Sequence, residues 1–171
     1  MIASRLFLRP IAPSDAPALF AARGDPEVMR FRDWPELKSA TELEEIIRGQ
    51  EHDLREGRMM WWAVALSPDG PAIGDCDLSE IDTHHGRAEV GFLFARAHWG
   101  KGYAREAMEA VLAHGFGQLD LKRLAARVHE GNDASIKLLA RLGFAYEGRL
   151  KSFVLRDGER RDCLLYGLVR G

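Results

Sequence analysis

Apolar residues recur at two different periods along the central segment of the chain, residues 87–116. Val90, Phe92 and Phe94 occupy every second position, which predicts a strand that buries one face. After Gly102, apolar residues recur every three or four positions, which predicts a helix with one apolar face. The two elements meet at the sequence Trp-Gly-Lys-Gly-Tyr-Ala, residues 99–104. The segment is therefore predicted to be a strand, a glycine-bearing turn and a helix.

The same two periods predict the other elements. Further strands are expected at residues 4–10, 60–66, 72–80, 121–129, 144–155 and 161–169. Ser14 is predicted to cap a short helix, and a longer helix covers residues 41–56. A third helix is capped by Asn132 or Asp133 and ends at Gly143. In the longer helix, Thr41 and Glu44 have the spacing of a capping box. Asp157-Gly158 is a hairpin-turn signal between the last two strands.

These elements predict a single α/β domain over residues 1–171. About seven strands form a mixed, mostly antiparallel sheet, and about four helices flank it. The strand within 87–94 and the strand at 121–129 are joined through a helix, so these fourth and fifth strands are predicted to run parallel.

Composition excludes several classes of function. The chain has 171 residues, 46% of them hydrophobic and 29% charged, and a formal net charge of −2, so a basic nucleic-acid footprint is absent. No apolar run approaches the roughly 20 residues that span a bilayer, and the N-terminal residues lack a signal-peptide pattern. We therefore expect no nucleic-acid or membrane partner and a cytoplasmic location. Cys76 and Cys163 are far apart and the six histidines have no metal-ligand spacing, so buried thiols and no metal site are expected.

The turn at residues 99–104 is predicted to bind an anion. Two glycines let the main chain approach a ligand, and the amides of the first helical turn have no partner inside the helix. With the helix dipole, they favour a phosphate or pyrophosphate, although a plain tight connection also uses glycines. No Walker ending follows Gly102, and the third glycine of a dinucleotide fingerprint is missing. A phosphate-bearing cofactor across the strand–helix junction is the remaining ligand.

The strand and turn, EVGFLF and HWGKGYAREA, resemble the acetyl-CoA-binding segment of the GNAT N-acetyltransferases. That segment has the pattern Gln/Arg-x-x-Gly-x-Gly/Ala, and Trp99 at its first position is usual in the RimJ/RimL-like branch. The stretch Asn132-Asp133-Ala134-Ser135, followed by Leu138-Leu139-x-x-Leu142-Gly143-Phe144, resembles the second block of that branch. The opening Arg5-Leu-x-Leu-Arg9-Pro10 with Asp15 resembles its first strand and helix. The similarity covers nearly the whole chain.

The resemblance implies acetyl-CoA as co-substrate and a fourth and fifth strand that splay apart to admit its pantetheine arm. The main chain near Leu93 receives the arm, and an amide there polarises the thioester carbonyl. Lys101 and Arg105 add positive charge near the diphosphate, or are simply solvated at a helix end, and Asn132 contacts the arm as well as capping its helix. The implied cofactor-binding residues are Leu93, Phe94, Ala95, Gly100, Lys101, Gly102, Tyr103, Ala104, Arg105 and Asn132.

Acetyl transfer to an amine also needs a base and an acid. Glu89 is the candidate base, acting through water, and its alternative is a structural or orienting carboxylate. Ser135 is the candidate proton donor to the leaving thiolate, with Tyr146 and Tyr103 as substitutes and a cap-adjacent hydroxyl as the plain alternative.

The acceptor pocket is implied to include residues 24–38. Phe31 and Trp34 are the candidate wall residues, and a loop with buried anchors is the alternative. Asp75 and Asp77 are further carboxylates able to hold a cationic acceptor.

The sequence therefore predicts an N-acetyltransferase that moves an acetyl group directly to a primary amine, without a covalent enzyme intermediate. The acceptor is a protein N-terminal amine or a small amine, because fold similarity does not transfer acceptor identity. One alternative is an acyl-CoA sensor without turnover, and a weaker one is a structural or dimerisation domain. A second copy of the chain, in a homodimer, is a further candidate partner.

Overall fold

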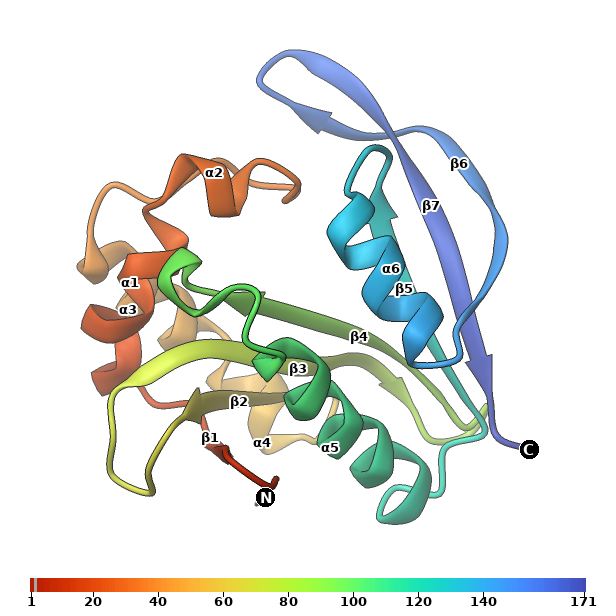
Figure 1. The fold of residues 1–171 in the computed structure, drawn as a ribbon, viewed down its shortest axis with the longest axis horizontal. Helices are drawn as coiled ribbons and strands as arrows, with labels where there is room; N and C mark the ends of the chain where they lie inside the picture. The colour runs from red at the N-terminus through yellow and green to blue at the C-terminus, as the bar shows by residue number, and fades with distance from the viewer. Residues whose placement is uncertain (2) are drawn as a thin grey trace.

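The computed structural model describes residue 1 and residues 3–171 and has an α/β architecture (Figure 1). Its seven strands form one sheet in the order β1-β2-β3-β4-β5-β7-β6. The strands are β1 (Phe7–Pro10), β2 (Met60–Ala65), β3 (Ala72–Asp82), β4 (Arg87–Phe94), β5 (Arg123–His129), β6 (Ala145–Arg156) and β7 (Glu159–Val169). The helices are α1 (Ala16–Arg23), α2 (Pro26–Met29), α3 (Ala40–Gly49), α4 (Glu51–Arg55), α5 (Tyr103–Gly117) and α6 (Asp133–Arg141), with 3-10 turns at Pro13–Asp15 and Arg96–His98.

The sheet opens between β4 and β5, the one pair of neighbouring strands in the described residues that run parallel. They pair over three positions, and the last pair joins Glu89 to Ala125. Beyond that point β5 stays paired with β7 as far as His129, while β4 continues beside β3, so the two strands diverge (Figure 1). The predicted mixed sheet with splayed fourth and fifth strands is confirmed.

The two faces of the sheet have separate cores. Trp62 and Val64 of β2 belong to the cluster that contains Met108 and Val111 of α5, so α5 covers that face. The intervening Trp61 belongs to the cluster of α1 and α3 on the opposite face. β4 alternates in the same way, because Val90 and Phe94 join the α5 cluster and Leu93 packs with α1 and α2. The period-two pattern of the sequence therefore decides which helix each strand residue meets.

Two predicted caps are wrong. Ser14 lies inside a 3-10 turn and makes no cap, because the Asp15 carboxylate accepts from the Ala12 amide at 2.9 Å. The Thr41–Glu44 capping box does not form, since Ser39 adopts extended backbone and its hydroxyl accepts from the Glu42 amide at 3.2 Å.

The number of helices was also underestimated. The described chain has six α-helices rather than about four, because the predicted 41–56 helix is interrupted at Gln50 and residues 26–29 form a four-residue helix.

The predicted helix cap, helix end and hairpin turn in the C-terminal part of the chain are confirmed. Asn132 caps α6 by accepting from the Ser135 amide at 3.2 Å, and Gly143 has a φ of +89° just after the helix. Asp157 and Gly158 form the β6–β7 turn with φ of +54° and +79°. Both cysteines are free and buried. Among the described residues, none of the helices has the length and apolar character needed to cross a bilayer.

Candidate active site

The N-terminus of α5 presents a row of free amides. Gly100 and Gly102 have φ of +73° and +81°, a conformation that residues with a Cβ rarely adopt. Within the described chain, none of the amides of residues 100–105 donates a hydrogen bond, and the first in the segment that does is Glu106 N, 3.1 Å from Gly102 O. These groups and the positive end of the helix dipole make the turn suited to an anion.

Positive side chains lie beside this turn. The guanidinium of Arg5, from the segment before β1, donates to Lys101 O at 3.2 Å and lies 5.0 Å from the centre of the Tyr103 ring. Lys101 has no carboxylate partner among the described residues, whereas Arg105 is paired with Glu109 at 2.8 Å. Of the two predicted cations, Lys101 is thus the better placed to meet an anion. Arg5 lies beside the turn but is paired with Glu106 at 2.8 Å.

The open edge of β4 presents alternate peptide groups to the gap. Ala95 N donates to Ile73 O at 3.0 Å, so Ala95 faces β3. Neighbouring residues of a strand direct their peptide groups to opposite sides. The N–H and C=O of Leu93 therefore also point to β3, and those of Phe92 and Phe94 point to the gap. Consistent with this, Phe94 O accepts from the Trp99 indole at 2.8 Å and Phe92 O accepts from the Arg32 guanidinium. The amide predicted near Leu93 to polarise the thioester carbonyl is therefore that of Phe92 or Phe94, because the Leu93 amide points to β3.

Trp99, the departure from the family pattern, thus has a structural role. Its indole N–H ties the turn before α5 to the end of β4 and leaves the tryptophan side chain partly exposed. Asn132 and Ser135, at the start of α6, are half-buried, and Tyr146 is exposed.

A cleft of about 510 Å³ opens beside the gap. Its walls come from the loop after α2, from α3 and from strands β3, β4 and β5. Phe31, Trp34 and Glu89, which were predicted on separate grounds, all line it. The other lining residues are Arg23, Met29, Arg32, Asp33, Pro35, Leu37, Leu43, Ile46, Asp77, Ser79, Val90, Gly91, Arg127, His129 and Cys163.

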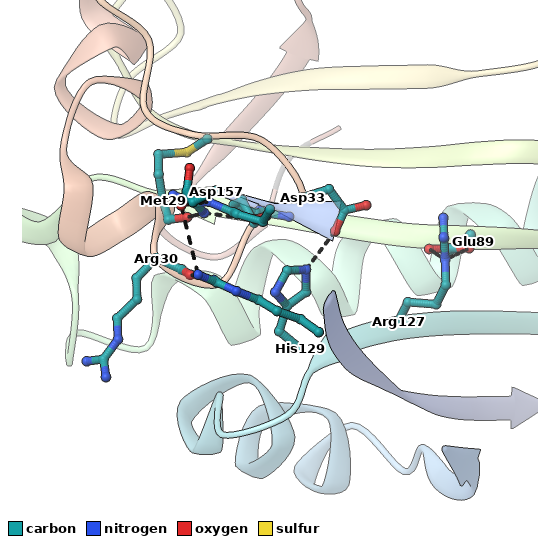
Figure 2. Close-up of polar contacts among 10 residues, drawn as sticks. Met29, Arg30, Asp33, Glu89, Arg127, His129 and Asp157 are labelled. Atoms are coloured by element: carbon teal, nitrogen blue, oxygen red, sulfur yellow. Dashed lines mark hydrogen bonds and ion pairs between the residues drawn. The ribbon is translucent and has the colours of Figure 1, made fainter. Parts of the chain in front are cut away.

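Glu89 lies at the last paired position of β4 and β5, where the two strands begin to diverge. Its two carboxylate oxygens accept from Arg127 Nε of β5 at 2.8 and 2.9 Å (Figure 2). Burial raises the pKa of Glu89, and the Arg127 guanidinium opposes that rise. The ion pair bridges the two strands at the mouth of the gap.

The loop after α2 is held down by long-range polar contacts. Asp33 Oδ1 lies 2.7 Å from Nε2 of the buried His129, and this hydrogen bond lowers the pKa of Asp33 (Figure 2). Arg156 of β6 donates to the carbonyls of Met29 and Arg32, the latter at 2.8 Å. These contacts fix the cleft wall that contains Phe31 and Trp34.

Asp75 and Asp77 of β3 differ in accessibility. Asp75 is 1% exposed, does not line the cleft, and accepts from Arg23 Nη2 at 2.7 Å and from the Trp61 indole at 3.0 Å. These contacts argue against the prediction that Asp75 could hold an acceptor, because the carboxylate is buried away from the cleft and its Oδ1 accepts from both groups. Asp77 is half-buried and lines the cleft.

Five residues that make polar contacts at the cleft or its wall were not predicted from the sequence: Arg32, Asp33, Arg127, His129 and Arg156. Arg127 and His129 alternate on the fifth strand, which was a usable signal for polar residues on one face. Their partners are up to 96 positions away in the chain, so the pairs themselves had no local signal. Within the described residues, no group of three or more His, Cys, Asp or Glu side chains is arranged to hold a metal.

Comparison with known proteins identifies the fold and its relatives. Residues 5–145 match the model of the acetyltransferase (GNAT) domain. The uncharacterized N-acetyltransferase p20 of Bacillus licheniformis is 32% identical over 166 residues, covering 97% of this chain and 93% of that protein.

Two solved structures are similar along nearly the whole chain. Mycobacterium smegmatis RimJ in complex with CoA-disulfide has a TM-score of 0.86 and 28% identity, covering 96% of this chain and 81% of that one. Spermidine N-acetyltransferase from Vibrio cholerae, in complex with CoA and spermine, has a TM-score of 0.84 and 25% identity, covering 97% and 96%. The resemblance predicted from the three sequence motifs is confirmed.

Proposed function

The chain belongs to the GNAT acetyltransferase family, and from this premise we propose that it transfers an acetyl group from acetyl-CoA directly to a primary amine. One observation carries the proposal: the free amides before α5 follow directly on the open edge of β4, and the cleft is lined by Glu89, where the pairing of β4 with β5 ends. A diphosphate at the amides and an amine in the cleft would place a thioester between them. Direct transfer requires this arrangement, because the amine nitrogen must lie next to the thioester carbonyl carbon.

In this proposal the cofactor is held mainly by main chain. The amides of Gly100 to Ala104 receive the diphosphate, with Lys101 as the nearby cation. The arm lies along residues 93–95, and the amide of Phe92 or Phe94 donates to the thioester oxygen. The Asn132 side-chain oxygen is occupied by the helix cap, so its amide NH₂ is the group left to donate to the arm.

Ser135 is proposed to protonate the departing thiolate. It lies in the first turn of α6, on the β5 side of the gap. We expect Ser135→Ala to lower kcat by about 100-fold or more, as for loss of a general acid, and to leave CoA affinity unchanged. Single-turnover thiol release and calorimetry measure the two quantities. An unaltered kcat would remove Ser135 from the reaction and leave Tyr103 and Tyr146 as the groups to replace next.

The acceptor is proposed to be a protein N-terminal amine or a small amine that enters the cleft between Trp34 and Glu89. The side chain of Trp34 is 76% exposed and supplies an apolar surface at the rim. RimJ-like and spermidine acetyltransferases are both among the similar proteins, so the acceptor classes are tested together. A cytoplasmic setting, where acetyl-CoA is available, is part of the proposal.

The test is release of free CoA thiol from acetyl-CoA by the purified protein, with N-terminal peptides and polyamines as acceptors. We expect one thiol and one acetylated amine per turnover. A sensor would bind CoA in calorimetry yet release no thiol with any acceptor, and a purely structural domain would not bind CoA.

Glu89 is proposed to act in its pair with Arg127. Both carboxylate oxygens of Glu89 accept from Arg127, and this contact across the two strands supports an orienting role, although burial keeps the pKa of Glu89 raised. We expect Glu89→Gln to lower kcat/KM by up to about 100-fold through misplacement, evenly across pH. A loss confined to low pH, where free amine is scarce, would identify Glu89 as the base instead.

A further inference from the structure

The carboxylates around the cleft differ in whether they have a cationic partner. Glu89 is paired with Arg127 at 2.8 Å, and Asp33 with His129 at 2.7 Å. Asp75 is buried against Arg23. Asp77 also lines the cleft, yet no Lys, Arg or His of the described chain forms an ion pair with it. It is therefore the carboxylate that remains available to a ligand.

The position of Asp77 is set by a glycine on the next strand. Asp77 of β3 pairs in register with Gly91 of β4. A Cβ on Gly91 would overlap the carboxylate, at 3.0 Å from its Cγ, so the side chain occupies the space that the glycine leaves. The carboxylate thus lies on the cleft side of β4, one residue from Phe92, whose peptide group faces the gap.

The groups that face Asp77 are accounted for by other contacts. On β3 and α1, Asp75 and Arg23 bind each other. Arg32, from the loop after α2, donates to Phe92 O and forms no ion pair with a described carboxylate, so its charge acts on Asp77. The remaining cleft charges, on β4, β5 and the same loop, form the pairs Glu89–Arg127 and Asp33–His129.

The surroundings of Asp77 raise its proton affinity. Burial and then the neighbouring Asp75 raise the pKa of Asp77 to about 6, against the opposing effect of Arg32 and Arg23. A carboxylate with such a pKa is ionised at neutral pH and is still basic enough to take a proton.

We propose that Asp77 binds the ammonium group of the acceptor and takes its proton. The inference rests on the proposed acetyl transfer. One N–H proton of the ammonium passes to a carboxylate oxygen of Asp77. The freed nitrogen lone pair forms the N–C bond to the thioester carbonyl carbon while the C=O π pair moves onto oxygen, which gives a tetrahedral intermediate. The C–S bond breaks as the intermediate collapses. The nitrogen gives its second proton through Ser135 to the thiolate, and Asp77 later releases its proton to water.

The assignment also defines the ligand. The group expected beside Asp77 is a primary ammonium, since the carboxylate lines the cleft next to the main chain of Gly91 and a primary ammonium can supply both protons of the transfer. An acceptor without a positive charge at the reacting nitrogen gains no ion pair with Asp77. The apolar surface of Trp34 at the rim of the cleft then contacts the substituent on the amine.

The experiment compares Asp77→Asn with the wild type, using the best acceptor from the thiol-release screen, from pH 5 to 9. The matched control is Asp69→Asn, which removes one carboxylate from the exposed β2–β3 turn. For the wild type, kcat/KM should rise to about pH 6 and then level off, because ionised Asp77 accepts the ammonium form. For Asp77→Asn we expect a loss of about 100-fold or more at pH 7, and a residual rate that rises with the free-amine fraction. CoA affinity should be unchanged in both variants.

The outcomes separate the two proposals. If the wild type turns over and Asp77→Asn keeps its rate and its pH profile, Asp77 is not the base, while acetyl transfer stands. If the wild type binds CoA but releases no thiol, both proposals fail. Should Asp77→Asn not fold, as judged by circular dichroism, Gly91→Ala displaces the carboxylate without removing it, and full activity in that variant overturns the assignment.

Discussion

Gly102→Val should weaken CoA binding by at least about 100-fold, equivalent to roughly 2.7 kcal/mol, while the protein stays folded. Gly102 is the N-cap of α5 with φ of +81°, where a β-branched residue is strained, so the turn must change its backbone path. Its Cβ would also lie 3.4 Å from Arg5 Nη2, beside the free amides. The variant therefore disturbs the orientation of the groups proposed to hold the diphosphate. Titration calorimetry with CoA measures the change.

Gly57→Val is the control for strain alone. Gly57 has φ of +69° in the turn after α4, and nothing lies within 4 Å of the position of its Cβ. We expect this variant to lose stability comparable to that lost by Gly102→Val, but to bind CoA as the wild type does. Wild-type affinity in Gly102→Val would show that the diphosphate is held elsewhere.

Short-range signals explain why the strand, turn and helix proposed to hold the cofactor could be predicted from sequence. The strand, turn and helix of residues 87–116 are contiguous, and each follows from a local cause: alternation, positive-φ glycines and a 3.6-residue period. Asn132 is similar, because its cap reaches only three residues along the chain. These features need no knowledge of the tertiary fold.

Helix starts were less predictable. Ser39 and Thr41 are both good capping residues, and the sequence does not reveal which one adopts extended backbone. The choice depends on how α3 packs on α1 and Trp61, which is a tertiary effect.

The cleft proposed to receive the acceptor depends on contacts between distant segments. Arg156 reaches Met29 across 127 positions, and His129 reaches Asp33 across 96. The different fates of Asp75 and Asp77 also have no sequence signal, since both side chains point to the same face of β3. What separates them is the placement of Arg23 and Trp61 over Asp75, and of Gly91 beside Asp77.

Asp75→Ala should lower the free energy of unfolding by about 3–5 kcal/mol, the cost of removing one partner of a buried ion pair. Asp75 is 1% exposed, and its partner Arg23 has a side chain that is only 21% exposed. The substitution would leave that guanidinium without a counter-charge and the Trp61 indole N–H without an acceptor. Urea denaturation followed by circular dichroism measures the loss, and Asp69→Ala, in an exposed turn, should change stability by less than about 0.5 kcal/mol.

A double variant distinguishes a structural Asp75 from one that binds the acceptor. Adding Arg23→Met to Asp75→Ala removes the orphaned charge, so stability should return in part and the two changes should not be additive. An acceptor-binding carboxylate predicts a different pattern, in which Asp75→Ala raises KM for the amine and leaves the urea midpoint in place. Because Asp75 and Asp77 lie on the same face of one strand, this pattern would also reverse the division of roles between them. From the contacts of Asp75 with Arg23 and Trp61, we expect Asp75→Ala to lower the free energy of unfolding. From the position of Asp77 beside Gly91, we expect Asp77→Asn to change the pH profile of kcat/KM.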